Sequence, residues 1–326
     1  MTTDLADVIP PKRKLSVKAT STPDRLFYGI ATVAAYSTIV LVVAIMFFLS
    51  LRAWPTFEKF GFFDFVFGSG WDNTIDNPTF SIGPMLYGSF LIAGIGVLFA
   101  VPMAISIAYF IEFMAPKPIA KATSFLVDLL AAIPSVVIGI WGLTIFSSVG
   151  AHWGEMLHNT FGFLPMFEND AGNFLRTPFI AGIIVSVMIV PIIASITREI
   201  FSQIDQDLIK ASLALGGNRE STFRKVILPT ASGGVIGGVL LALGRALGET
   251  VAIFFVLNLV FNDVNWFRIV LPEGGAIASL ILAKFADATA DEISALLAAG
   301  VVLFVFTLII NSIASYIVVK AQPWRK

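Results

Sequence analysis

The 326-residue sequence contains no cysteine and only two histidines, His152 and His158. The lack of cysteine excludes disulfides, thiol catalysis and cysteine-ligated metal sites, and two histidines are too few for a histidine-based metal site. The sequence also has no GxxxxGK[ST] phosphate-binding loop. If the protein uses ATP, a separate chain must therefore supply the ATPase.

Charged residues are also scarce. They make up 13% of the chain, whereas hydrophobic residues make up 57%, and a soluble domain has roughly 25% charged residues. The apolar residues form long runs, and about 20 such residues suffice for a helix to cross a bilayer core of about 30 Å. The sequence therefore predicts an all-α integral membrane protein.

Six apolar runs are long enough to span a membrane. We expect transmembrane helices at about 26–51, 82–113, 124–149, 178–200, 230–260 and 293–319. The first run is too long for a signal peptide and is not followed by a small-residue cleavage site, so it is expected to be retained. The segments between the runs are predicted to be a tail at 1–25, an extracytoplasmic loop at 52–81, further polar segments at 150–177, 201–229 and 261–292, and a tail at 321–326.

Lysine and arginine are distributed unevenly between the two sides of this topology. Fifteen of them lie in the N-terminal tail, the loop with Lys117 and Lys121, the 198–229 segment and the C-terminal tail, against five in the other loops. Such residues favour the cytoplasmic side. The pattern predicts that both termini are cytoplasmic, which agrees with an even number of spans.

The segment "DQDLIKASLALGGNRESTFRKVILP", residues 205–229, predicts two short amphipathic helices. Gly216 and Gly217 end the first helix, and Asn218 caps the second with Glu220 in its first turn. Pro229 marks the join to the fifth span. The apolar faces need a partner, which is the membrane surface, the protein's own bundle or another protein.

The fifth run contains "GRALGET", residues 244–250, with Arg245 and Glu249 four residues apart. On one helix they would share a face. A charge at the centre of a membrane helix costs about 2.5–3.5 kcal/mol, and pairing offsets only part of that. The two residues form either a static ion pair in the bundle or a polar part of a substrate path. The glycine pairs 233/237 and 244/248 predict close helix contacts.

The 205–229 segment resembles the EAA loop of ABC-transporter permeases, which reads E-A-A, then glycine, nine residues and I-x-L-P. Here Gly216 is followed by nine residues and then by "VILP". Lys210 stands at the position of the glutamate, and Ser212 replaces the second alanine. The resemblance implies that the loop docks on a cytoplasmic ATPase through Lys210, Ala211, Ser212, Gly216, Gly217, Leu228 and Pro229.

"GRALGET", "LLAAIPSVVIGIWGL" (129–143) and "MIVPIIASITREIF" (188–201) resemble the phosphate ABC-transporter permeases of the PstC type over about 85–320. The resemblance implies a six-helix permease bundle in the inner membrane, with its core at 82–320 and coupling helices within 201–229. It implies that Arg245 and Glu249 take part in phosphate passage.

The same resemblance implies the partners. They are a PstA-type permease as heterodimer, two PstB-type ATPase subunits that bind the ATP, a PstS-type binding protein and membrane lipids, with no nucleic acid. The chain itself is expected to need no cofactor and to have no enzymatic activity of its own.

Importing phosphate against an inside-negative potential costs about 2.3 kcal/mol per charge per 100 mV, so uptake needs coupled energy. Two alternatives to an ATP-driven phosphate importer remain at this stage. One is a stand-alone secondary transporter that relays protons through Glu249 or Asp128, and the other is an ABC permease for a related oxyanion. An intramembrane enzyme is disfavoured because no set of catalytic residues is apparent.

Overall fold

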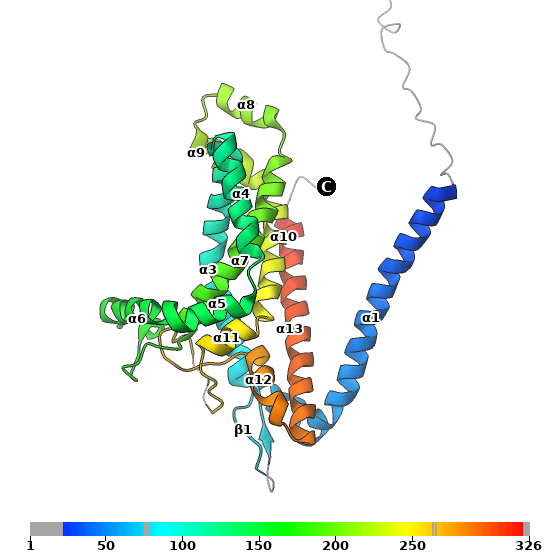
Figure 1. Cartoon of the computed structure of the whole chain (residues 1–326), viewed down its shortest axis with the longest axis vertical. Coiled ribbons are helices and arrows are strands. Elements are labelled where there is room, and N and C mark those ends of the chain that lie inside the picture. Colours follow the sequence, from blue (N-terminus) through cyan, green and yellow to red (C-terminus); the bar gives the residue numbers. More distant parts are fainter. Residues whose placement is uncertain (1–21, 75–77, 263, 265, 322–326) are drawn as a thin grey trace, which may run out of the picture. The chain divides into compact units, whose positions relative to one another are not determined.

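The structure is a computed structural model that describes residues 22–74, 78–262, 264 and 266–321 (Figure 1). Residues 1–21 and 322–326, which hold most of the two predicted tails, lie outside this range. The chain divides into two compact units, Met1–Phe48 and Leu49–Lys326. The boundary falls within α1 (Thr22–Phe60), a helix that continues beyond the predicted end at residue 51. The span within α1, Arg25–Phe60, is apolar.

The second unit is almost wholly helical. Helices of two turns or more are α3 (Gly83–Tyr109), α4 (Lys117–Ala131), α6 (Ser147–Phe161), α7 (Pro178–Ser202), α8 (Gln206–Ala214), α10 (Leu228–Leu247), α12 (Ile277–Lys284) and α13 (Ala290–Ala321). Shorter helices are α2 (Phe62–Phe67), α5 (Ser135–Trp141), α9 (Arg219–Thr222) and α11 (Val251–Val256). Phe110–Met114 (η2), Gly142–Phe146 (η3) and Phe223–Ile227 (η5) are π-helical, and Pro165–Phe167 (η4) and Phe285–Asp287 (η6) are 3₁₀ turns. Trp71–Asp72 (β1) and Thr79–Phe80 (β2) form a small antiparallel sheet.

Six stretches of the described chain are long and apolar enough to cross a membrane, which confirms the predicted fold class. The third stretch differs from its prediction at 124–149, because it covers Ser135–Phe161. The chain leaves the helical conformation between α4 and α5, next to Pro134. Since a proline disfavours helical geometry in the residue before it, this break has a local cause.

Helices α3 and α7 form the centre of the second unit, and α10 and α4 pack on α7. Their shared core contains large buried side chains such as Ile92, Ile184, Ile189 and Ile193. Figure 1 shows α8 and α9 at one end of this bundle and β1 and α12 at the other. These are called the α8 end and the β1 end below. Figure 1 also shows that α5 and α6 run across the direction of α3 and α7.

A buried carboxylate joins the β1 strand to the start of α13. Glu292 is 4% exposed, and it accepts hydrogen bonds of 2.8 Å from Trp71 Nε1 and Asn73 Nδ2. Its neighbour Asp291 forms a 2.7 Å ion pair with Lys59 in which both side chains are about half exposed. Glu292 thus stabilises the start of α13 through buried hydrogen bonds, whereas Asp291 does so through an ion pair that is exposed to solvent.

We expect Glu292→Leu to destabilise the protein by about 1–3 kcal/mol, because the Trp71 and Asn73 donors would lose their acceptor inside the protein. Asp291→Asn is the matched control, with an expected loss of about 0–1 kcal/mol because its ion pair is exposed. The measurement is the melting temperature of the purified protein in detergent. Equal shifts for the two variants would contradict a dominant role of Glu292.

Candidate functional site

The fifth span, predicted at 230–260, is interrupted after residue 247. Helix α10 ends at Leu247, Gly248 lies just beyond it, and α11 begins at Val251. The amide of Gly248 donates to the carbonyl oxygens of Gly244 and Arg245 at 3.2 Å, so the last turn of α10 closes normally. Arg245 thus lies in the last turn of one helix, and Glu249 lies in the link to the next.

This break separates the two charged residues that were predicted to share a helix face. Arg245 is exposed, whereas Glu249 is 8% exposed. Glu249 Oε1 accepts a 3.4 Å hydrogen bond from the Ala252 amide, in the first turn of α11, where the helix dipole favours a negative charge. No ion pair joins Arg245 to Glu249 within the described part of the chain. The expected pairing on one helix face is therefore wrong for this structure.

Arg245 and Glu249 nevertheless line the same cavity. It has a volume of about 390 Å³, and Ser135, Gly248, Thr250 and Val251 complete its lining. Ser135 is the first residue of α5, so the break between α4 and α5 meets the break between α10 and α11 at this cavity. No sequence pattern marks Ser135 as a site residue, although Pro134 before it signals an interruption of the helix.

Helix α5 holds α11 in place through a close contact. A Cβ atom on Gly139 would lie 2.8 Å from the Cα of Ala252, which is shorter than a van der Waals contact. Glycine therefore permits a packing distance here that no other residue allows. This contact positions the link between α10 and α11, and with it Glu249.

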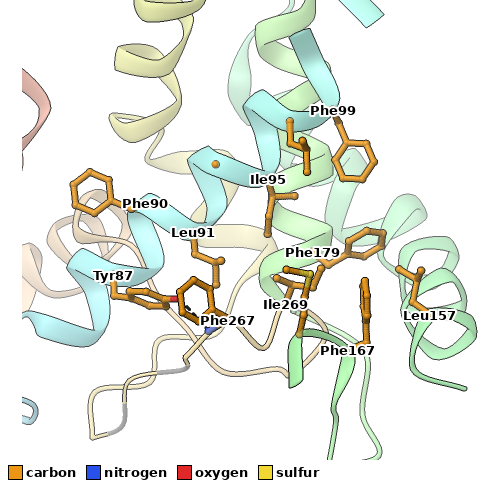
Figure 2. A pocket seen from close by; sticks show the side chains of 13 residues that line it. Tyr87, Phe90, Leu91, Ile95, Phe99, Leu157, Phe167, Phe179, Phe267 and Ile269 are labelled. Carbon is orange, nitrogen blue, oxygen red and sulfur yellow. Dashed lines mark hydrogen bonds between the residues drawn. The ribbon is translucent and has the colours of Figure 1, made fainter. Parts of the chain in front are cut away.

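A larger cavity of about 490 Å³ lies along α3 (Figure 2), but it lacks charge. Tyr87, Leu91, Ile95 and Phe99 of α3 line it together with apolar residues such as Phe179. The Tyr87 hydroxyl accepts a 2.9 Å hydrogen bond from the amide of Phe267. The residues that line this apolar cavity include no charged group to bind an anion. The described residues also contain no cluster of ligands for a metal ion.

The predicted helix–glycine–helix loop is present at the α8 end. Gly216 has a φ angle of +85°, a conformation that glycine adopts without strain. Asn218 caps α9 by accepting a 2.8 Å hydrogen bond from the Ser221 amide, as expected. Ser212 and Thr222 hydroxyls lie 2.9 Å apart and join the two helices across the turn.

The second loop helix is not separate from the fifth span. Residues Arg219–Leu247 form one continuous helical stretch, with the π-turn η5 inside it. Leu228 and Pro229 are thus the first residues of α10 within that stretch, and Pro229 does not separate two elements. Proline lacks the amide donor that a residue inside a helix normally uses, and here it directly follows the π-turn, where the Leu228 amide bonds to the Phe223 carbonyl oxygen.

The apolar side chains of the loop face two directions. Phe223 and Ile227 pack on the bundle, and the Phe223 ring lies 4.4 Å from that of Tyr109 between centroids. Leu208 and Leu213 are about half exposed, and Leu215 is 89% exposed. The second half of the loop therefore binds its own bundle, and the first half presents apolar side chains outward.

The other predicted loop residues are at the surface. Lys210 forms a 3.0 Å ion pair with Asp207, with both side chains largely exposed, and Ala211 is also exposed. Gly217 lies against Ser212, whose carbonyl oxygen would be 2.7 Å from an added Cβ. The structure thus brings Ser212, Gly216 and Gly217 together at the turn, with Lys210 and Ala211 on the outer side of α8.

One predicted glycine contact is wrong. A Cβ on Gly237 would meet no atom within 4 Å, whereas Cβ atoms on Gly234 and Gly238 would lie within 3 Å of Ile200 and Ile196 of α7. The close contact between α10 and α7 therefore involves a glycine pair that is offset by one residue from the predicted pair 233/237. The spacing of the glycines predicted a close helix contact, but it did not determine which face of α10 is turned toward α7.

Comparison with known proteins identifies the family. Residues 96–321 match the model of the "Binding-protein-dependent transport system inner membrane component" family. The phosphate transport system permease protein PstC of Pasteurella multocida is 33% identical over 290 residues, which cover 86% of this chain and 87% of that protein. The PstC of Mesorhizobium japonicum is 31% identical over 315 residues, 94% of each chain.

Solved structures agree with this fold. A chain of a bacterial alginate ABC transporter, in complex with an alginate-bound periplasmic protein, has a TM-score of 0.60 at 16% identity and covers 92% of this chain and 96% of its own. A chain of the MetNI methionine ABC transporter has a TM-score of 0.53 at 16% identity, with coverages of 74% and 94%. From the family match, the PstC relatives and the six spans, this chain is a multi-pass membrane protein that belongs to the binding-protein-dependent transport system inner membrane components.

Proposed function

We propose that this protein is the PstC-type permease subunit of an ATP-driven phosphate importer. Its relatives are named phosphate transport system permeases, and the observation that carries the proposal is the cavity at Arg245. A guanidinium binds the oxygens of an oxyanion through paired, charge-assisted hydrogen bonds. Arg245 is exposed to a cavity large enough for such an anion and has no carboxylate partner among the described residues.

Glu249 has a second role in this proposal. Its carboxylate lines the same cavity but points to the first turn of α11. It keeps a negative charge close to Arg245 without occupying the guanidinium. Conduction requires an anion site that binds weakly enough to release its ion, and the nearby carboxylate lowers the affinity of Arg245 for phosphate.

The orientation follows from the charge distribution. We infer that the α8 end faces the cytoplasm and that both termini are on that side. Lys117 begins α4 close to η2, and the tip of α3, η2 and the loop share one apolar cluster. Figure 1 places the C-terminal end of α13 toward the same end. These segments contain the excess of lysine and arginine, which favours the cytoplasmic side.

The chain is proposed to act in an assembly. A PstA-type permease completes the translocation path, two PstB-type subunits bind and hydrolyse the ATP, and a PstS-type protein delivers phosphate at the β1 end. The outward-facing Leu208, Leu213 and Leu215 of the loop are the surface offered to an ATPase subunit. A stand-alone proton-coupled transporter gains no support. Asp128 lies 3.8 Å from Arg198 in an ion pair, and no hydrogen bonds among the described residues link it to Glu249.

We expect Arg245→Ala to reduce phosphate uptake by the assembled transporter by about ten- to hundredfold, because charge-assisted contacts contribute about 1.5–3 kcal/mol. Assembly should be retained, since Arg245 is exposed and its loss leaves no described carboxylate unpaired. The measurements are uptake of radiolabelled phosphate into proteoliposomes and co-purification of the subunits. Loss of assembly would instead assign Arg245 a structural role, and unchanged uptake would remove it from the path.

We expect Leu215→Asp to weaken binding of the ATPase subunits, because it places a charge on an apolar contact. The exposed position keeps the core intact, and a negative charge at the C-terminal end of α8 costs only about 0.3–1 kcal/mol. Gln206→Asp adds the same charge to the same exposed loop, in the first turn of α8 where it is favourable, and serves as control. The measurement is the amount of ATPase that co-purifies with the permease. An equal loss in both variants would show a general charge effect and contradict docking through Leu215.

A further inference from the structure

A second polar cavity lies at the other end of α11. It has a volume of about 260 Å³ and is lined by Arg176, Asn258 and apolar side chains from η3, α11 and the chain after it. The Arg245 cavity includes Val251, the first residue of α11, and this cavity includes Phe254 and Phe255. Six helical residues extend roughly 9 Å, so the two cavities lie at opposite ends of one short helix.

Arg176 is held in an unusual backbone conformation. Its φ angle is +55°, which is uncommon for a residue with a side chain and costs roughly 1–3 kcal/mol. The next residue, Thr177, caps α7 by accepting a hydrogen bond from the Ile180 amide. The chain thus turns sharply at Arg176 and enters α7 at once, and this fixes where the arginine side chain begins.

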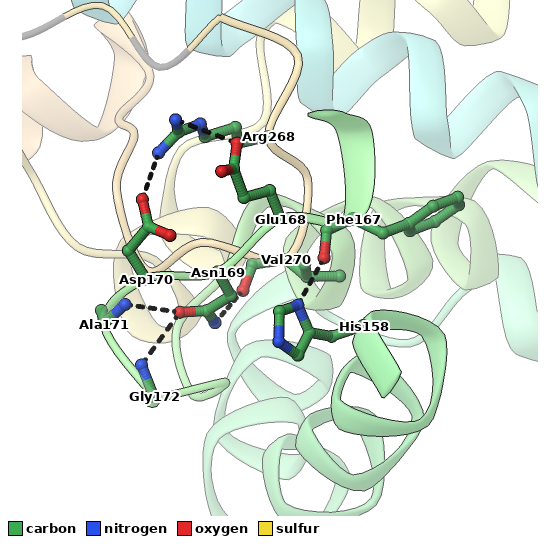
Figure 3. A network of polar contacts seen from close by, with 9 residues as sticks. All are labelled: His158, Phe167, Glu168, Asn169, Asp170, Ala171, Gly172, Arg268 and Val270. Carbon is green, nitrogen blue, oxygen red and sulfur yellow. Dashed lines mark hydrogen bonds and ion pairs between the residues drawn. The ribbon is translucent and has the colours of Figure 1, made fainter. Parts of the chain in front are cut away.

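The loop before Arg176 is anchored by the polar network of Figure 3. Asn169 is 6% exposed, and its Nδ2 donates to the carbonyl oxygens of Asn173 and Val270 while its Oδ1 accepts from the amides of Ala171 and Gly172. Arg268 pairs with Glu168 and Asp170 at 3.1 and 3.2 Å. The segment that presents Arg176 is therefore held firmly against residues 268–270.

Arg176 differs from Arg268 in its electrostatic partners. Arg176 Nη1 donates to Asn258 Oδ1 at 3.4 Å, and the Asn258 amide is itself oriented by a 3.2 Å hydrogen bond to the Pro272 carbonyl oxygen. This long contact uses one of five guanidinium donors. No carboxylate pairs with Arg176 in the part of the chain that the structure describes, so its positive charge is directed to the cavity without a counter-ion.

We propose that Arg176 and Asn258 form a second oxyanion-binding site, which holds phosphate at the β1 end before it reaches Arg245. The inference rests on the proposed function. Arg176 supplies charge and paired donors, and the Asn258 amide keeps the guanidinium turned toward the cavity. Two weak sites in series let an anion leave one as it enters the next, whereas one strong site would retain it.

The test uses the complete transporter, with its partner permease, ATPase subunits and binding protein, in proteoliposomes. Arg176→Gly removes the guanidinium but suits the positive φ angle, so the fold is kept. We expect it to reduce phosphate taken up per ATP hydrolysed about tenfold, and Arg176→Lys to restore part of this ratio because the charge returns. Lys284→Gln removes a positive charge at the β1 end, outside both cavities, and should leave the ratio unchanged.

The remaining outcomes overturn the inference in distinguishable ways. Unchanged uptake in Arg176→Gly would show that Arg176 serves only the turn into α7. Weaker binding of the phosphate-loaded binding protein to this variant, with a normal ratio of uptake to hydrolysis, would assign Arg176 to protein docking. If the unmodified transporter carries no phosphate, the proposed function itself fails and this site falls with it.

Discussion

Backbone amides and carbonyls at membrane depth must find partners inside the protein, because lipid supplies none. A chain can therefore leave the helical conformation there only where protein or a polar cavity surrounds it. This chain leaves the helical conformation between α4 and α5, just before its third apolar stretch, and again between α10 and α11, just after its fifth. The two interruptions meet at the cavity that contains Ser135, Arg245 and Glu249, and the contact of Gly139 with Ala252 holds them together.

The break after Leu247 separates the two charged side chains, so they do not form an ion pair along one helix. On an unbroken helix, Arg245 and Glu249 would neutralise each other. Here the glutamate satisfies an amide of α11, and the arginine remains directed to a cavity. Separation of the two charges turns a self-contained ion pair into a cationic site with a nearby anion, which is an arrangement suited to transient binding of an oxyanion.

The continuous helical stretch from Arg219 to Leu247 connects the loop at the α8 end to this site. With a rise of 1.5 Å per residue, its 29 residues extend roughly 40 Å. Phe223 and Ile227 fix its first turns to the bundle, while Arg245 lies in its last turn. The proposed docking residues of α8 lie before the Gly216–Gly217 turn. From Arg219 onward, a displacement passed across this turn would reach the arginine through one helix.

The sequence by itself determined the membrane class, the number of apolar spans, the glycine turn at Gly216 with its Asn218 cap, and the residue types at the site. These features depend on run length, local backbone preference and composition, which short stretches of chain carry. Only the tertiary structure decided where α10 ends, which glycines contact α7, and that Arg176 and Asn258 share a cavity. Those features depend on helix rotation and on contacts between residues distant in the sequence, such as Gly139 with Ala252, and local periodicity contains no information about either.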